Sequence, residues 1–194
     1  MQGFYAMLSK MKYINRWSLM RNTREENLSE HSYEVATITH CLGMIANKRL
    51  SGNVNIEKMV LYSLYHDVSE IITGDMPTPI KYFNEEIQLA YKNVEQTAVK
   101  NLIKMLPQDF KQEYSDILFM NDIGEHEKLL IKAADKISAL IKCIEEEKAG
   151  NKEFYDAKRT IEQSIDDMKL SEANIFISEF LSSYKGTIDE LTEM

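Results

Sequence analysis

Apolar side chains recur at helical spacing over long stretches of this chain, and this pattern narrows the choice of fold more than any other feature. In segment 125–149, steps of three and four join Leu130, Ala133, Ala134, Ile137, Leu140, Ile141 and Ile144. Such a stripe is typical of an amphipathic α-helix. Only seven glycines and three prolines interrupt the 194 residues, and no run alternates like a strand that ends in a hairpin. The sequence therefore predicts an all-α protein.

The same periodicity predicts the order of the elements. We expect a first helix that begins at Phe4, followed by helices over 29–48, 55–74, 82–105, 108–120, 125–149, 152–169 and 171–185. A chain of this length can form one domain with a substantial core. The prediction is a single helical bundle over residues 1–185, followed by an acidic C-terminal tail over 186–194 that frays.

Local signals predict where the helices begin and end. Ser29 and Asn55 are the residue types that cap a helix N-terminus, and Gly74 is the type that follows a helix C-terminus. The prolines cluster in Asp75–Pro79. Because proline restricts its own φ and the residue before it, this loop is predicted to be extended and stiff.

Composition and charge exclude several classes of function. With 44% hydrophobic and 28% charged residues, the chain is typical of a soluble globular protein. Its net charge of -8 argues against a broad basic surface for nucleic acid. No apolar run approaches the length of a membrane span or signal sequence, so we expect a cytoplasmic protein. Cys41 and Cys143 lie in helical patterns and are expected to be reduced thiols.

A histidine and an aspartate are adjacent in the strongly apolar segment 59–72. This dipeptide, His66-Asp67, lies where a helix apolar over most of its circumference is expected to be buried. A buried charge must be paired, hydrogen-bonded or bound to a cation. Neighbouring helical residues point about 100° apart and can reach one ion from two directions. The dipeptide alone leaves a satisfied core histidine and a metal ligand both open.

Among the other histidines, only one lies on a predicted apolar face. His31 precedes Val35, Ile38 and Leu42 at helical steps, so it is expected to point at the core and is a ligand candidate. His40 falls on the opposite face of the same helix, and His126 begins a helix among acidic residues.

Two carboxylates complete the set of candidates. Glu70 follows His66 by four residues, so on one helix it would hang near a water bound to a metal at His66 and could act as a general base or acid. Asp135 lies off the centre of the apolar stripe between Lys132 and Lys136. Periodicity alone favours a surface ion pair for Asp135.

The order His31, His66-Asp67, Asp135 on a helical chain resembles the HD phosphohydrolase superfamily, in which two His and two Asp bind one divalent metal. Flanking blocks closely match its bacterial 5′-deoxynucleotidase (YfbR-like) family: Ile14–Trp17, Leu19–Asn22, Glu26–Ser32, Tyr65–Glu70, Thr73–Asn84, the segment around Cys143 and Ala149–Phe154. The resemblance covers nearly the whole chain and is weakest between Lys104 and Glu127 and at the C-terminus.

The resemblance implies a fold, an activity and a set of roles. It implies an HD-domain helical bundle that hydrolyses 2′-deoxyribonucleoside 5′-monophosphates, works as a homodimer and holds one divalent metal. The implied metal ligands are His31, His66, Asp67 and Asp135, and His31, Asp67 and Asp135 also line the substrate site. The ligand set suits Mn, Co, Zn or Fe without ranking them.

The implied substrate residues fit their roles chemically. Arg16 would orient the phosphate, since its guanidinium matches phosphate oxygens. Trp17 would pack on the sugar, where an apolar wall excludes a 2′-hydroxyl. Glu70 would act on the nucleophilic water. The remaining nucleotide contacts would come from Asp75, Met76, Pro77 and Thr78, with Asp75 close to the reacting water and the sugar.

Three other functions remain open at this point. A nucleoside triphosphate or alarmone hydrolase needs more cations, which Arg21 and Arg24 could supply. A bimetal cyclic-dinucleotide phosphodiesterase needs further histidines, and neither His40 nor His126 is well placed. A catalytically inactive binding or scaffolding module would be expected to lack at least one of these groups: a member of the two-His, two-Asp set, Arg16 or Glu70.

Overall fold

The computed structural model describes residues 2–81 and 83–192, apart from the side chain of Thr78. Over these residues the chain folds into α-helices and short 3-10 turns, so the all-α prediction is confirmed. The extended structure found there is a single antiparallel bridge between Asn15 and Asn27. No helix in the described ranges is both long enough and apolar enough to cross a bilayer.

The chain divides into two compact units. The first comprises residues 1–21, 25–33 and 64–122, and the second comprises 22–24, 34–63 and 123–194. Helix α2 (Leu28–Arg49) contributes its first turns to the first unit and the rest to the second.

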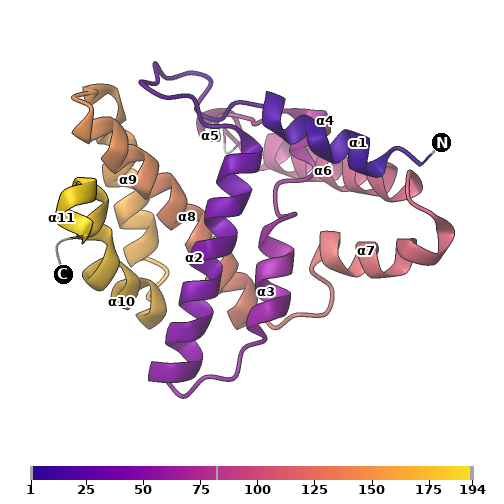
Figure 1. The fold of residues 1–194 in the computed structure, drawn as a ribbon. Helices are drawn as coiled ribbons and strands as arrows, with labels where there is room; N and C mark the ends of the chain where they lie inside the picture. Colours follow the sequence, from indigo (N-terminus) through magenta and orange to yellow (C-terminus); the bar gives the residue numbers. More distant parts are fainter. Residues whose placement is uncertain (1, 82, 193–194) are drawn as a thin grey trace. The chain divides into compact units, whose positions relative to one another are not determined.

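The first unit is built around the long helix α6. Its elements are α1 (Phe4–Leu8), a 3-10 turn (Ser9–Tyr13), α4 (Glu70–Thr73), α5 (Thr78–Lys81), α6 (Glu85–Lys104), a second 3-10 turn (Gln108–Phe110) and α7 (Lys111–Phe119). Helices α1, α4, α5 and α7 all contact α6 (Figure 1). Its core consists of Phe4, Val68, Val99, Leu102 and Leu106. Val68 directly follows the His66-Asp67 dipeptide, so packing in this core anchors the segment that carries it.

The second unit is built around α8. Its elements are α3 (Ile56–Ser63), α8 (Glu125–Lys148), a 3-10 turn (Lys152–Phe154), α9 (Tyr155–Asp166), α10 (Ser171–Phe180), another 3-10 turn (Leu181–Lys185) and α11 (Ile188–Thr192). Helix α8 contacts α3, α9 and α10. All seven apolar residues of its predicted stripe are buried, as expected for a helix that packs on several neighbours.

Two local predictions need correction. The cap of α2 is Asn27 rather than Ser29, because the Asn27 side chain accepts hydrogen bonds from the backbone N–H groups of Ser29 and Glu30. The proline-dense loop is only partly extended, since α5 begins at Thr78. Within the predicted tail over 186–194, α11 forms over Ile188–Thr192 and the Thr187 N–H donates to Glu190, while residues 193–194 lie outside the described part of the chain; the fraying of this tail stays a prediction.

The largest correction concerns the segment predicted as one helix over 55–74. Helix α3 ends at Ser63 and α4 begins at Glu70, so His66 and Asp67 lie in turns between two helices. Backbone hydrogen bonds here span three residues, from Val68 N–H to Tyr65 O and from Glu70 N–H to Asp67 O. Apolar spacing could not reveal this, because tight turns and an α-helix place side chains at similar intervals.

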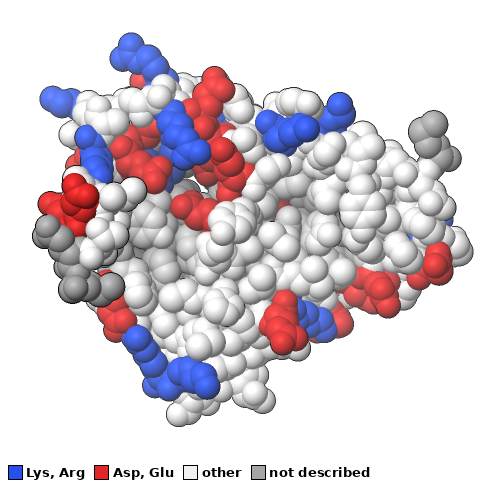
Figure 2. Space-filling view, in the orientation of Figure 1, with Lys and Arg blue, Asp and Glu red and all other residues white. Residues whose placement is uncertain are grey.

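The charged surface agrees with the acidic composition. On the face drawn in Figure 2, the described Lys and Arg side chains lie in separate groups, some of them beside acidic side chains, and form no continuous basic surface there. That face offers nothing of the kind that neutralises a series of nucleic-acid phosphates.

Candidate active site

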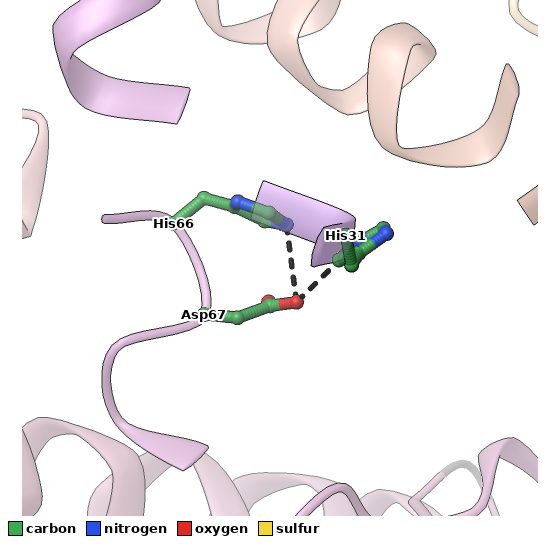
Figure 3. A group of neighbouring side chains, drawn as sticks. All are labelled: His31, His66 and Asp67. Carbon is green, nitrogen blue, oxygen red and sulfur yellow. Dashed lines mark ion pairs between the residues drawn. The ribbon is translucent and has the colours of Figure 1, made fainter. Parts of the chain in front are cut away.

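Three side chains of the first unit bring possible metal-ligating atoms together. Nε2 of His66 lies 3.1 Å, and Nε2 of His31 3.5 Å, from the same Oδ2 of Asp67 (Figure 3). Two atoms bound to one ion at about 2.1 Å lie about 3.0 to 3.4 Å from each other. The spacing therefore fits ligands of one ion. Two imidazoles and a carboxylate also fit a divalent transition metal chemically.

The three ligand candidates come from two places in the sequence. His31 lies on α2 with its side chain fully buried, which confirms that it is on the apolar stripe. His66 and Asp67 come from the turns before α4, and their side chains are only 9% and 19% exposed, so the expectation of a largely buried pair is confirmed although the helix predicted to carry it is not. His40, on the opposite face of α2, is exposed as predicted.

Arg16 lies beside this group. Its Nη1 is 3.6 Å from Oδ2 of Asp67, the oxygen that faces both histidines. Burial would raise the pKa of Asp67, but the charge of His66 and the close approach of the His31 and His66 rings outweigh burial and hold that pKa well below its usual range. Asp67 is therefore a carboxylate, the form that ligates a metal. A guanidinium next to a metal site is well placed to hold a phosphate oxygen.

Glu70 is buried at the N-terminus of α4, only 6% exposed. Its Oε2 has no hydrogen-bond partner among the described residues. Burial raises the pKa of Glu70 to about 9, and the charges of Asp67 and Asp75 act in the same direction. Glu70 was predicted to share a helix face with His66; instead, the turns before α4 bring it near Asp67. A buried carboxyl with a strongly perturbed pKa is typical of proton-transfer groups.

The segment predicted to contact the nucleotide follows α4. Asp75, Met76 and Pro77 are all half-buried. Burial raises the pKa of Asp75, the charge of Asp67 adds to this, and the charge of Arg16 and a hydrogen bond from the Trp17 backbone oppose it. Asp75 is thus a neighbour of both Arg16 and Trp17. The side chain of Thr78, also predicted to contact nucleotide, lies outside the described part of the chain.

The fourth predicted ligand belongs to the second unit. Asp135 is half-buried on α8 and belongs to the second unit, so its role stays a prediction. His126, placed by the sequence at a helix start among acidic residues, is half-exposed and lies 3.0 Å from the buried Glu172. This pair is a structural contact within the second unit.

Sequence reasoning missed the residues that hold the site in place. The hydroxyl of Tyr91 donates to Thr73 Oγ1 at 3.1 Å, just before the predicted nucleotide-contact segment. Just after that segment, Lys81 bonds Glu95 at 2.9 Å and lies over the Tyr91 ring. Glu26, in the loop before α2, contacts several site residues. No periodic pattern marks such loop and cross-helix contacts.

Comparison with solved structures identifies the class of fold. An HD-domain phosphohydrolase from Listeria innocua matches with a TM-score of 0.82 and 25% identity, covering 93% of this chain and 87% of that one. The cyanophage S-2L HD phosphohydrolase DatZ, bound to dA and one catalytic Zn²⁺, matches with a TM-score of 0.66 and 19% identity over 94% and 96% of the two chains. The helical fold and the His/His/Asp group are those of an HD-domain phosphohydrolase.

Sequence comparison narrows this class to one family. A family model described as 5′-deoxynucleotidase YfbR-like matches residues 3–184. A 5′-deoxynucleotidase of Yersinia pestis (strain Pestoides F) is 44% identical over 99% of this chain and 98% of its own length. Another, from Enterobacter sp. (strain 638), is 43% identical over 98% and 96%. The chain belongs to the 5′-deoxynucleotidase YfbR-like family.

Proposed function

We propose that this protein is a metal-dependent 5′-deoxynucleotidase, which hydrolyses 2′-deoxyribonucleoside 5′-monophosphates to deoxynucleoside and phosphate. The observation that carries the proposal is the meeting of a His/His/Asp donor set and the Arg16 guanidinium at one oxygen of Asp67. This arrangement offers a cation site and an anion site side by side, which a phosphomonoester needs. The names of the close relatives support the substrate class.

His31, His66 and Asp67 would hold the metal ion, with Asp135 as the proposed fourth ligand. When bound, a divalent ion lowers the pKa of a coordinated water and polarises a phosphoryl oxygen. Arg16 binds a phosphate oxygen and orients the phosphorus for attack.

Glu70 transfers the proton of the attacking water. The oxygen of this water forms the new bond to phosphorus, the bond between phosphorus and O5′ breaks, and O5′ leaves as a protonated hydroxyl. Asp75 lies on the sugar side of this reaction.

The oligomeric state and the cellular location are also part of the proposal. The resemblance supports a homodimer that acts in the cytoplasm. The substrate contacts proposed for Met76, Pro77 and Thr78 likewise rest on the match between these residues and the family.

A substrate panel tests the proposal. Phosphate release is measured from dNMP, NMP and dNTP substrates with Mn²⁺, Co²⁺, Zn²⁺ and Mg²⁺. We expect inorganic phosphate from dNMPs, with NMPs hydrolysed more slowly. Release of pyrophosphate or triphosphate from dNTPs would instead identify a triphosphate hydrolase, and metal binding without turnover would identify a silent binding module.

Trp17→Ala is expected to narrow the preference for dAMP over AMP. An apolar wall denies a ribose 2′-hydroxyl a hydrogen-bond partner, and burying an unpaired hydroxyl costs about 1–3 kcal/mol, or about 5- to 150-fold in kcat/KM. The measurement is the ratio of kcat/KM for the two nucleotides. Leu19→Ala, an exposed position in the same loop, is the control and should leave the ratio unchanged. An unchanged ratio in Trp17→Ala would remove Trp17 as the sugar discriminator.

Asp135→Asn is expected to weaken binding of the metal. Loss of a ligand should lower metal affinity by at least about 10- to 100-fold, the range found for groups that only support ligands. Titration of the metal-free protein with Zn²⁺ measures this. Glu145→Gln, an exposed change on the same helix, is the control. Equal Zn²⁺ affinity of the two variants would exclude Asp135 as a ligand.

A further inference from the structure

The carboxylate of Glu26 contacts three predicted site residues. Its Oε2 accepts a hydrogen bond from the indole Nε1 of Trp17 at 3.0 Å. Its Oε1 lies 3.5 Å from Nδ1 of His31 and 3.7 Å from Nε of Arg16. Glu26 therefore lies between a ligand of the proposed metal and the two residues proposed to hold the phosphate and the sugar.

The backbone keeps Glu26 in this position. The N–H of Arg16 donates to the carbonyl of Glu26 at 2.9 Å, and the N–H of Leu28 donates to the carbonyl of Ile14 at 3.0 Å. These bonds form the antiparallel bridge between Asn15 and Asn27. Since Asn27 also caps α2, the helix that carries His31 begins directly at this bridge.

Trp17, the residue whose indole donates to Glu26, has a strained backbone. Trp17 has φ 59°, in the left-handed region that a bulky residue rarely adopts. Such a conformation persists only where surrounding contacts hold it. Contacts of Trp17 that help to do so include its carbonyl, which accepts from the Met20 N–H at 2.9 Å, its backbone, which donates to Asp75, and its indole, which donates to Glu26. Glu26 thus helps to set the direction of the indole ring.

We propose that Glu26 is a positioning residue. It couples the proposed metal site to the sugar wall, the apolar surface that Trp17 would present to the deoxyribose. Oε1 holds His31 with its proton on Nδ1, so that the lone pair of Nε2 faces Asp67 and can ligate a metal. Oε2 holds Trp17 in its strained conformation. Carboxylates that accept from the second ring nitrogen of a ligating histidine fix its tautomer and orientation. The sugar-wall half of this proposal rests on the proposed function, whereas the link from His31 to Trp17 does not.

The link is tested without substrate, because Trp17 is the only tryptophan of the chain and its fluorescence reports on one indole. Zn²⁺, which has no redox or paramagnetic effects of its own, is titrated into the metal-free protein. In the wild type, we expect Zn²⁺ to shift the tryptophan emission. In Glu26→Gln, which removes one of the two acceptor oxygens, we expect Zn²⁺ affinity to fall by about 10- to 100-fold. The emission should then no longer respond at saturating Zn²⁺.

Two variants serve as checks on this experiment. Glu25→Gln changes the adjacent, exposed carboxylate and should behave as the wild type does. Glu26→Asp keeps the charge but withdraws the carboxylate by one methylene, so it should reproduce the loss of the emission response if Glu26→Gln fails to fold. Wild-type Zn²⁺ affinity together with a wild-type emission response in Glu26→Gln or Glu26→Asp would overturn the proposal.

A second arm measures the selectivity for deoxyribose. Trp17→Phe keeps an aromatic wall but lacks the indole N–H, so it breaks only the Glu26–Trp17 bond. Both Glu26→Gln and Trp17→Phe are expected to lower the dAMP/AMP ratio of kcat/KM, and the double variant should lower it no further. Only the variants at Glu26 should weaken Zn²⁺ binding. Additive effects of the two substitutions on this ratio would refute the coupling of Glu26 to Trp17. Absence of any phosphatase activity would contradict the proposed function, and the fluorescence experiment would then decide the proposal for Glu26.

Discussion

Glu70→Ala is expected to bind metal as the wild type does and to lose most of its turnover of dAMP. General acid–base groups typically contribute about 10²- to 10⁴-fold to a rate, and we expect kcat to fall within that range. The reason lies in the position of Glu70: its Oε2 is buried without a hydrogen-bond partner in the described residues, next to Asp67 and Asp75. A carboxyl group so placed serves no evident structural purpose.

The measurement pairs kinetics with a metal assay on the same preparation. Glu70→Gln, which keeps the shape but cannot exchange a proton, should lose as much turnover as Glu70→Ala. Glu57→Gln, an exposed change on α3, is the matched control and should retain full activity. Near-normal hydrolysis of dAMP by metal-loaded Glu70→Ala would show that another group moves the proton.

Glu146→Ala is expected to destabilise the protein by about 3–5 kcal/mol, the usual result of removing one partner of a buried ion pair. Both Lys142 and Glu146 are almost fully buried on α8, and Nζ of Lys142 donates to Glu146 at 2.5 Å. The same carboxylate accepts from the backbone and hydroxyl of Thr23 and from the amide of Asn151. Removing it leaves a buried ammonium without its counter-ion and several donors without an acceptor.

Denaturant unfolding measures this loss. Glu145→Ala, one position away but exposed, is the control and should change the free energy of unfolding by no more than about 0.5 kcal/mol. Equal stability of Glu145→Ala and Glu146→Ala would mean that the network contributes little.

The stability of the wild type should depend on pH through the same group. Burial would raise the pKa of Glu146, but hydrogen bonds from Lys142, Asn151 and Thr23 lower it from 4.5 to about 2. The unfolded chain therefore binds a proton at higher pH than the folded one. The contribution of Glu146 is fully present above pH 4.5 and is lost as pH falls towards about 2. Glu146→Gln should lack this part of the acid dependence, and an identical acid profile in both proteins would contradict the assignment.

Helical periodicity predicted the fold class because it reports which residues face a core. The stripe of α8 and the burial of His31 follow from it directly. The same signal was wrong about segment 55–74, where a run of apolar residues contains turns between α3 and α4. Burial leaves a record in the residue pattern, whereas the choice between hydrogen bonds spanning three or four residues does not.

The chemistry of the site was predictable in kind but not in arrangement. The resemblance to a known family pointed to five site residues, and the first unit brings all five together. They are His31, His66, Asp67, Arg16 and Glu70. No sequence signal singled out Glu26, because its contacts depend on a bridge between two loop strands and on the strained backbone of Trp17.

The amino-acid sequence by itself determined that this protein is helical, which faces of its helices are apolar, and which family it resembles. Only the tertiary structure decided that His66 and Asp67 leave the helix to meet His31, and that the Glu26 carboxylate contacts both the His31 imidazole and the Trp17 indole. The physical reason is one of range. Helix propensity and amphipathic spacing act between residues a turn apart, while a site is made by side chains and backbone hydrogen bonds that join distant segments.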